Sequence, residues 1–168
     1  MRKIFEPLLA GMRAEGTPFR GILYGGLMIE RGEPKVLEFN VRMGDPETQP
    51  LMHRLRSNWG EVLLAAATPG GLAGMKLQWA ADPSVCVVMA ASGYPGTPKT
   101  GDRITGIDAC SALPGAPVVF QAGTKLVDGN LVTSGGRVLG VTASGADLKT
   151  AIANAYTAVG KIHFEGAH

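Results

Sequence analysis

In the first 69 residues, helical and strand-like patterns of apolar residues follow one another. Ile4, Leu8 and Met12 are spaced four apart, which predicts a helix near the N-terminus. Two runs of β-favouring residues come next, and the turn residues between them predict a hairpin. The predicted elements are a helix over residues 2–15, strands over 21–30 and 35–42, and helices over 50–55 and 59–67.

The pattern changes after the turn sequence Pro69-Gly70-Gly71. Short apolar runs separated by turn residues predict a series of strands, and apolar residues at helical spacing predict a final amphipathic helix. The predicted strands are 85–91, 103–107, 118–121, 125–127, 131–133 and 137–142, and the predicted helix is 147–162. We therefore expect an α+β chain with one domain over residues 1–69 and a second, antiparallel β domain closed by a helix over 70–168.

Composition places the chain among globular proteins. It has 168 residues, of which 45% are hydrophobic and 18% charged, with a net charge of +2, so a disordered chain is excluded. Nucleic acid is not an expected partner because the basic residues are not clustered. No apolar run is long enough to span a bilayer, and the chain is expected to be soluble and cytoplasmic. The two cysteines and three histidines lack the spacing of a zinc or redox motif.

The most informative segment is the predicted strand over residues 35–42. Because side chains alternate between the faces of a strand, Glu38, Asn40 and Arg42 are expected to share one face, opposite Leu37, Phe39 and Val41 on the core face. The carboxylate and the amide oxygen are hard donors that suit Mg²⁺ or Mn²⁺. Arg42 would then lie beside a phosphate carried by the ion. The same alternation is also typical of a half-exposed strand with a solvated polar face.

Two turns add candidate chemistry. Asp45 and Glu47 place two more carboxylates directly after this strand, although a Gly-Asp-Pro turn is also an ordinary strand terminator. Gly135, Gly136 and Arg137 could form a phosphate-cradling nest and are candidate nucleotide contacts. The alternative for these three residues is a simple hairpin bend.

One long segment resembles a known family. Residues 37–49, LEFNVRMGDPETQ, closely resemble the metal-binding strand and following turn of the glycinamide ribonucleotide synthetase family, which belongs to the ATP-grasp superfamily. Four further blocks are similar to the same family: residues 21–28, 91–96, 120–125 and 133–140. The resemblance covers nearly the whole chain.

The resemblance implies both a fold and a reaction. The fold would be a partial ATP-grasp antiparallel sheet with helices, followed by a small antiparallel β lobe. The reaction would join glycine to 5-phosphoribosylamine in purine biosynthesis, with ATP and Mg²⁺ or Mn²⁺ as cofactors and a glycyl phosphate as intermediate. Glu38 and Asn40 match the family's metal ligands, and Arg42 would stabilise the transferred phosphoryl group. Asp45 and Glu47 would hold a substrate amine.

The chain also departs from the family pattern. The N-terminal lobe that clamps the nucleotide does not precede Met1, so the chain alone is expected to be inactive and to require that missing part as a partner. Gln121 stands where the family usually has His. The alternative function is a non-catalytic docking or assembly module that pairs with a separate nucleotide-binding polypeptide. An apolar face over residues 22–28 would favour such docking or dimerisation, and either a monomer or a homodimer is expected.

Overall fold

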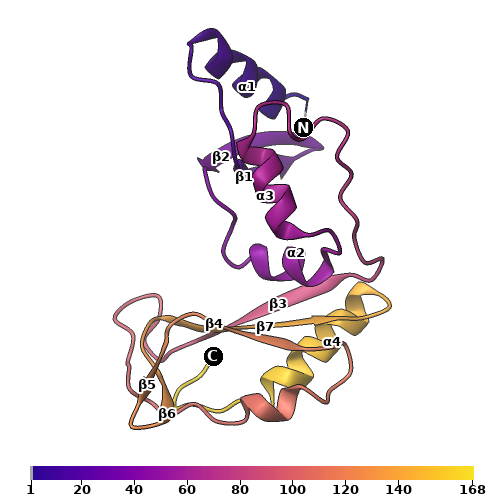
Figure 1. The fold of residues 1–168 in the computed structure, drawn as a ribbon. Coiled ribbons are helices and arrows are strands. Elements are labelled where there is room, and N and C mark those ends of the chain that lie inside the picture. The colour runs from indigo at the N-terminus through magenta and orange to yellow at the C-terminus, as the bar shows by residue number, and fades with distance from the viewer. Residues whose placement is uncertain (1) are drawn as a thin grey trace. The chain divides into compact units, whose positions relative to one another are not determined.

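The computed structural model describes residues 2–168, which form two compact units (Figure 1). Unit 1 contains the residues up to Gly44 together with Ser57–Gln78, and unit 2 contains Asp45–Arg56 and Trp79–His168. The units are interleaved along the chain, and the domain boundary expected between residues 69 and 70 stays a prediction. None of the helices within residues 2–168 is long and apolar enough to cross a membrane.

Unit 1 is built on a single β-hairpin. Its strands pair antiparallel, and the turn that joins them places Arg31 and Gly32 at φ values of 50° and 81°. The third helix begins after Asn58, whose side chain accepts hydrogen bonds from the backbone nitrogens of Gly60 and Glu61. The elements of unit 1 are α1 (Phe5–Ala14), β1 (Tyr24–Glu30), β2 (Glu33–Asn40) and α3 (Trp59–Ala67).

A β-bulge interrupts this hairpin. Gly26 pairs with Glu38 while Leu27 pairs with Val36, so Leu37 is the extra residue. A Cβ at Gly26 would come within 3.0 Å of the Glu38 Cγ. Gly26 therefore leaves room for the Glu38 side chain, as a glycine in a strand often does for a close neighbour.

The apolar face of the hairpin lacks the expected cover. Leu37, Phe39 and Val41 were expected to face a core, but their exposed fractions are 66%, 40% and 76%. The reason is that the sheet has only two strands, and α1 reaches it chiefly through Phe5, whose ring centroid lies 6.0 Å from that of Phe39. A two-stranded sheet without further layers buries little, and Val62 is the one buried hydrophobic residue among those described in unit 1.

Unit 2 consists of a three-stranded sheet between two helices, with a second hairpin beside it (Figure 1). The strand order in the sheet is β3-β7-β4, and both pairings are antiparallel. The second hairpin pairs β5 with β6 across Asp128 and Gly129, which both have positive φ. The elements are α2 (Thr48–Arg54), β3 (Ser84–Ala90), η1 (Ile107–Cys110), β4 (Val118–Gln121), β5 (Thr124–Val127), β6 (Asn130–Thr133), β7 (Arg137–Ser144) and α4 (Leu148–Val159).

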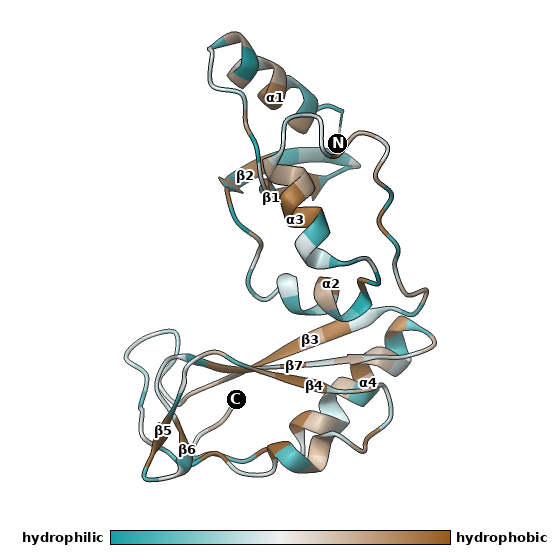
Figure 2. Cartoon of the chain, viewed as in Figure 1, coloured by the Kyte–Doolittle hydropathy of each residue, from teal (hydrophilic) through white to brown (hydrophobic). Residues whose placement is uncertain are grey.

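The core of unit 2 lies on the face of the sheet that α4 covers. Leu139 and Val141 are 1% and 0% exposed and pack in one cluster with Ala158 and Ile162 from the C-terminal helix and its end. Strands β3 and β4 of this sheet are largely hydrophobic (Figure 2). The α+β class with antiparallel sheets and a closing helix is therefore confirmed.

The prediction of a strand over residues 103–107 is wrong. The structure has only isolated bridges there, from Arg103 to Val132 and from Thr105 to His163. The backbone turns away at Gly106, which has a φ of 87° and lies so close to the Lys161 carbonyl that a Cβ would not fit. A short 3-10 helix then takes the place of the strand's end.

The start of α4 provides a test of stability against pH. Asp147 accepts a 2.7 Å hydrogen bond from the Thr150 backbone nitrogen, and this bond holds the pKa of the carboxyl below its ordinary value. A lowered pKa means that the carboxylate stabilises the fold above the unfolded pKa, about 3.9, and that this contribution is lost as pH falls through the folded pKa.

We expect Asp147→Ala to lower the melting temperature at neutral pH and the difference from wild type to shrink below about pH 3.9. Thermal unfolding followed by circular dichroism measures both. Asp82→Ala is the control, because Asp82 is exposed and its side chain has no partner among the described residues. A difference that stays constant down to strongly acidic pH would contradict the role of the charge.

Candidate functional site

Glu38 and Asn40 lie together at the end of β2. Both side chains project from the same face of the strand, and the Asn40 Nδ2 donates a 2.9 Å hydrogen bond to the Glu38 Oε1. Glu38 is exposed and Asn40 is half-buried. This bond uses the Glu38 Oε1 and the Asn40 Nδ2, and it leaves the Glu38 Oε2 and the Asn40 Oδ1 outside it. Two hard oxygen donors are therefore available side by side.

This donor pair fits a divalent cation that is completed by other ligands. No group of three or more His, Cys, Asp or Glu residues in the described part of the chain could hold a metal ion by itself. Mg²⁺ typically takes one or two protein ligands and completes its shell with water and substrate phosphates. A carboxylate and an amide oxygen on one strand face match that requirement.

Arg42 lies beyond the strand on which it was expected. The strand ends at Asn40, two residues earlier than predicted, so strand alternation does not fix the direction of Arg42. Its exposed guanidinium donates a 2.8 Å hydrogen bond to the carbonyl of Met43. Its role at a phosphate stays a prediction.

Asp45 belongs to unit 2, where it pairs with Arg137 at the start of β7. The Arg137 guanidinium makes two contacts with Asp45: one nitrogen lies 3.1 Å from the carboxylate Oδ2, and the other donates to the backbone carbonyl at 3.1 Å. The two residues are 92 positions apart in the sequence. Glu47, the second predicted carboxylate, is exposed at the N-cap of α2.

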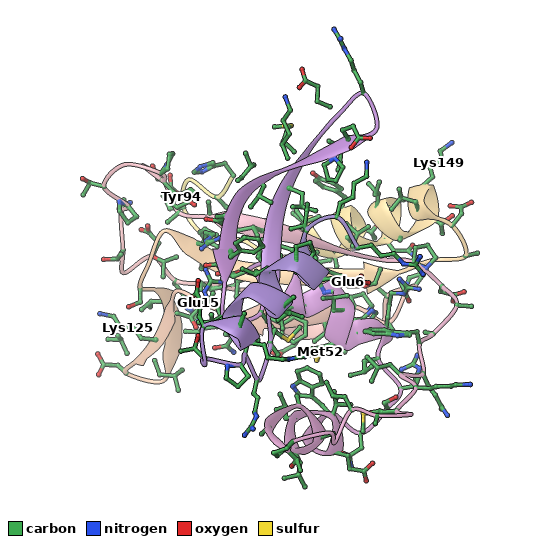
Figure 3. The ribbon with its side chains drawn as sticks, turned by 90° about the horizontal axis from the view of Figure 1, so that it is seen from above. Glu6, Glu15, Met52, Tyr94, Lys125 and Lys149 are labelled. Atoms are coloured by element: carbon green, nitrogen blue, oxygen red, sulfur yellow. The ribbon has the colours of Figure 1, made fainter. Side chains whose placement is uncertain are left out.

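The glycines of the predicted phosphate nest are explained by close packing. A Cβ at Gly136 would lie 2.4 Å from the Tyr94 ring, and one at Gly135 would lie 3.2 Å from the Gly123 Cα. Tyr94 comes from the loop after β3 (Figure 3). Neither Gly135 nor Gly136 adopts the left-handed conformation that alternates with the right-handed one in a nest. Nucleotide binding by this turn stays a prediction that the local geometry does not favour.

Gln121 lies at the end of β4, close to this turn in the same sheet. Its Oε1 accepts a 3.0 Å hydrogen bond from the Thr124 hydroxyl. A histidine ring nitrogen at this position could accept a similar bond. The consequence of having Gln in place of His for substrate affinity stays a prediction.

Sequence reasoning missed the pairing of Asp45 with Arg137. Each residue was selected for its own motif, and no local spacing links positions so far apart. The sequence offered only an indirect signal. The acidic Asp45 follows one predicted strand and the basic Arg137 begins another, so both residues were expected at the ends of strands. Only the tertiary structure brings them together.

The two cysteines of unit 2 are free thiols with different surroundings. Cys110 is 2% exposed, and its sulfur lies 3.5 Å from the Ala158 carbonyl oxygen. Burial raises the pKa of both Cys110 and the half-buried Cys86, and Asp45 adds a further, smaller increase at Cys86. Both thiols are therefore weak nucleophiles in the folded chain.

We expect Ellman's reagent to modify Cys110 more slowly than Cys86 in the folded chain and both at similar rates after unfolding. Cys86→Ser and Cys110→Ser variants report each thiol separately. Rapid modification of Cys110 in the folded Cys86→Ser variant would contradict its burial in the core.

Comparison with known proteins gives consistent matches in both units. A family model described as phosphoribosylglycinamide synthetase, C domain, matches residues 84–168. A second model, the ATP-grasp (A) domain of the same synthetase, matches residues 1–48. The second match includes the Glu38 and Asn40 pair.

The individual proteins to which the chain is similar share the name phosphoribosylamine–glycine ligase. The phosphoribosylamine–glycine ligase of Xylella fastidiosa (strain Temecula1) is 53% identical over 169 aligned positions, covering 99% of this chain and 38% of the relative. The chloroplastic ligase of Arabidopsis thaliana is 48% identical, with 32% of its length covered. The chain thus spans less than half of the length of these curated relatives.

A solved structure confirms the fold at the level of the whole chain. The crystal structure of phosphoribosylamine–glycine ligase from Thermotoga maritima matches with a TM-score of 0.78 and 38% identity, over 99% of this chain and 40% of that one. This match agrees with the expected combination of a partial ATP-grasp sheet and an antiparallel β lobe. Together with the two family models, it shows that the chain belongs to the phosphoribosylglycinamide synthetase family.

Proposed function

We propose that this chain supplies the metal ligands and part of the substrate site of an ATP-dependent ligase that joins glycine to 5-phosphoribosylamine. The observation that carries the proposal is the adjacent pair of oxygen donors on Glu38 and Asn40, in the segment that the ATP-grasp family model matches. The relatives named above are ligases of this kind. Since the chain spans a minority of their length, the nucleotide clamp is supplied by further polypeptide.

Each residue has a distinct part in the proposed reaction. In the first step the glycine carboxylate attacks the γ-phosphorus of ATP, which gives glycyl phosphate and ADP. The 5-phosphoribosylamine nitrogen then attacks the carbonyl carbon, phosphate leaves, and a proton is lost from the nitrogen. Glu38 and Asn40 would hold Mg²⁺ or Mn²⁺, and the bound cation would offset the charge on the phosphate oxygens. Arg42 adds a planar cation beside the transferred group.

Asp45 is assigned to the ammonium group of glycine. The glycine amine is protonated at neutral pH, so a carboxylate binds it favourably. The amine of 5-phosphoribosylamine, in contrast, must be neutral to act as a nucleophile, and a nearby carboxylate would favour its unreactive protonated form. Glu47, two residues later, provides a second acceptor for the same group.

A fusion protein tests the proposal. The part of the Xylella fastidiosa ligase that this chain does not match is joined in front of Met1, and ADP release is measured with ATP, Mg²⁺, glycine and 5-phosphoribosylamine. We expect turnover by the fusion that requires both amine substrates, and none by the chain alone. A folded fusion that binds ATP but forms no product, when the intact relative is active, would contradict the proposal.

The same experiment separates the second candidate function. The exposed apolar face of the β1–β2 hairpin, on which Leu37 and Phe39 lie, favours contact with further polypeptide. A non-catalytic docking module would use that contact for assembly only. It would bind the separate nucleotide-binding part without restoring turnover, whereas a ligase subunit restores it.

A further inference from the structure

We propose that Arg137 is a positioning residue, which fixes the Asp45 carboxylate for the substrate ammonium, and is not itself a nucleotide ligand. This inference rests on the proposed function. It reassigns Arg137 from the predicted phosphate nest to the turn after the metal-binding strand. The two residues lie in the same compact unit.

The contact geometry fixes Asp45 at two points. One guanidinium nitrogen of Arg137 lies 3.1 Å from the Oδ2 of the carboxylate, and the other holds the backbone carbonyl of the same residue at 3.1 Å. Contact with both the side chain and the main chain restricts the rotation of the carboxylate as well as the position of the turn. The rigid, planar fork of arginine suits this arrangement, and a lysine can reproduce only part of it.

The backbone of Arg137 is itself held on both sides. Its carbonyl accepts a 2.9 Å hydrogen bond from the Gly123 nitrogen, and the preceding Gly136 carbonyl accepts one of 2.8 Å from the Ala91 nitrogen. A Cβ at Gly123 would lie 2.6 Å from the Arg137 carbonyl oxygen. The Arg137 backbone is therefore held tightly in the sheet. Its side chain can restrict the motion of the exposed turn at Asp45.

The pairing leaves one carboxylate oxygen for a ligand. The Arg137 guanidinium contacts the Asp45 Oδ2, and the Oδ1 takes no part in that contact. Asp45 is about half exposed, at 52% of its side chain. A carboxylate oriented in this way can accept hydrogen bonds from an ammonium group without first being ordered, which lowers the entropic cost of binding.

Stability alone does not account for the pair. Both side chains are substantially exposed, 42% for Arg137 and 52% for Asp45, and ion pairs of that exposure add little to folding free energy. The guanidinium is also already engaged on Asp45, so fewer of its donors remain for a phosphate. Orientation of a functional carboxylate explains both observations.

A double-mutant cycle in the fusion ligase tests this inference. We expect Arg137→Met to raise the KM for glycine by roughly tenfold or more, the effect of losing a charge-assisted contact, with the KM for ATP changed less than about twofold. Arg137→Lys should recover part of the loss. In an Asp45→Asn background, Arg137→Met should add little further effect, because the two residues act as one unit.

The control is Arg103→Met, which removes an exposed arginine of the same unit whose side chain has no partner among the described residues. It should leave both KM values unchanged. If Arg137→Met instead raises the KM for ATP, or if its effect persists in full beside Asp45→Asn, the positioning role is wrong and direct phosphate binding is favoured. An inactive parent fusion would overturn the proposed function itself, and with it this inference.

Discussion

Glu38→Ala and Asn40→Ala are each expected to lower the turnover of the fusion ligase by about 10²–10³-fold, the range seen when one group that stabilises transition-state charge is removed. The Glu38 carboxylate and the Asn40 amide oxygen form the adjacent pair of hard donors that we assign to the metal. Loss of one leaves the cation poorly held and the phosphate charge less well offset. Raising the Mg²⁺ concentration should recover part of the activity.

The matched control for these variants is Glu33→Ala. Glu33 lies on the same strand, is exposed, and pairs with Lys3 at 2.6 Å. Its removal should change turnover less than about twofold, because exposed ion pairs contribute little. Full activity in both Glu38→Ala and Asn40→Ala would remove the metal assignment.

Leu139→Ala is expected to destabilise unit 2 by about 3 kcal/mol, within the usual range for a fully buried leucine. Leu139 is 1% exposed at the centre of the cluster between the sheet and α4, so truncation leaves a cavity in addition to the lost burial. Urea unfolding followed by circular dichroism measures the change.

Leu126→Ala is the control for that measurement. Leu126 lies on β5 and is 73% exposed, so its truncation should cost less than about 0.5 kcal/mol. Equal losses for Leu126→Ala and Leu139→Ala would show that the core does not lie between the sheet and α4.

Local sequence patterns predicted the helices and strands well where caps and turn residues set their ends. The helix over Trp59–Ala67 and the strand over Val118–Gln121 have the expected bounds. In the helix, Asn58 caps the first turn, and the apolar run ends before a turn sequence. The two-residue turn between β5 and β6 was likewise predictable from an Asp-Gly pair.

Features that depend on tertiary contacts were not predictable. The bulge at Leu37 reflects the approach of Glu38 to Gly26 across the hairpin, and the sequence showed only that a glycine stood in a strand. The exposure of Phe39 depends on how many layers cover the sheet, which strand alternation does not specify.

The candidate site likewise has one feature that was predictable from the sequence and one that was not. The adjacency of Glu38 and Asn40 was predictable because the two residues are two apart on one strand, and alternation places them on one face. The partner of Asp45 was not predictable, because Arg137 reaches it only through the fold of unit 2. The resemblance to a family supplied roles for single residues and no information on their contacts.

The most direct test of the central assignment is an anomalous difference map from crystals of the fusion ligase grown with Mn²⁺ and ATP. We predict a manganese peak within about 2.1 Å of a Glu38 carboxylate oxygen and of the Asn40 side-chain oxygen, the distance typical of a small divalent cation. A manganese peak bound to the nucleotide phosphates but coordinated by other residues, with Glu38 and Asn40 both beyond contact, would contradict the assignment.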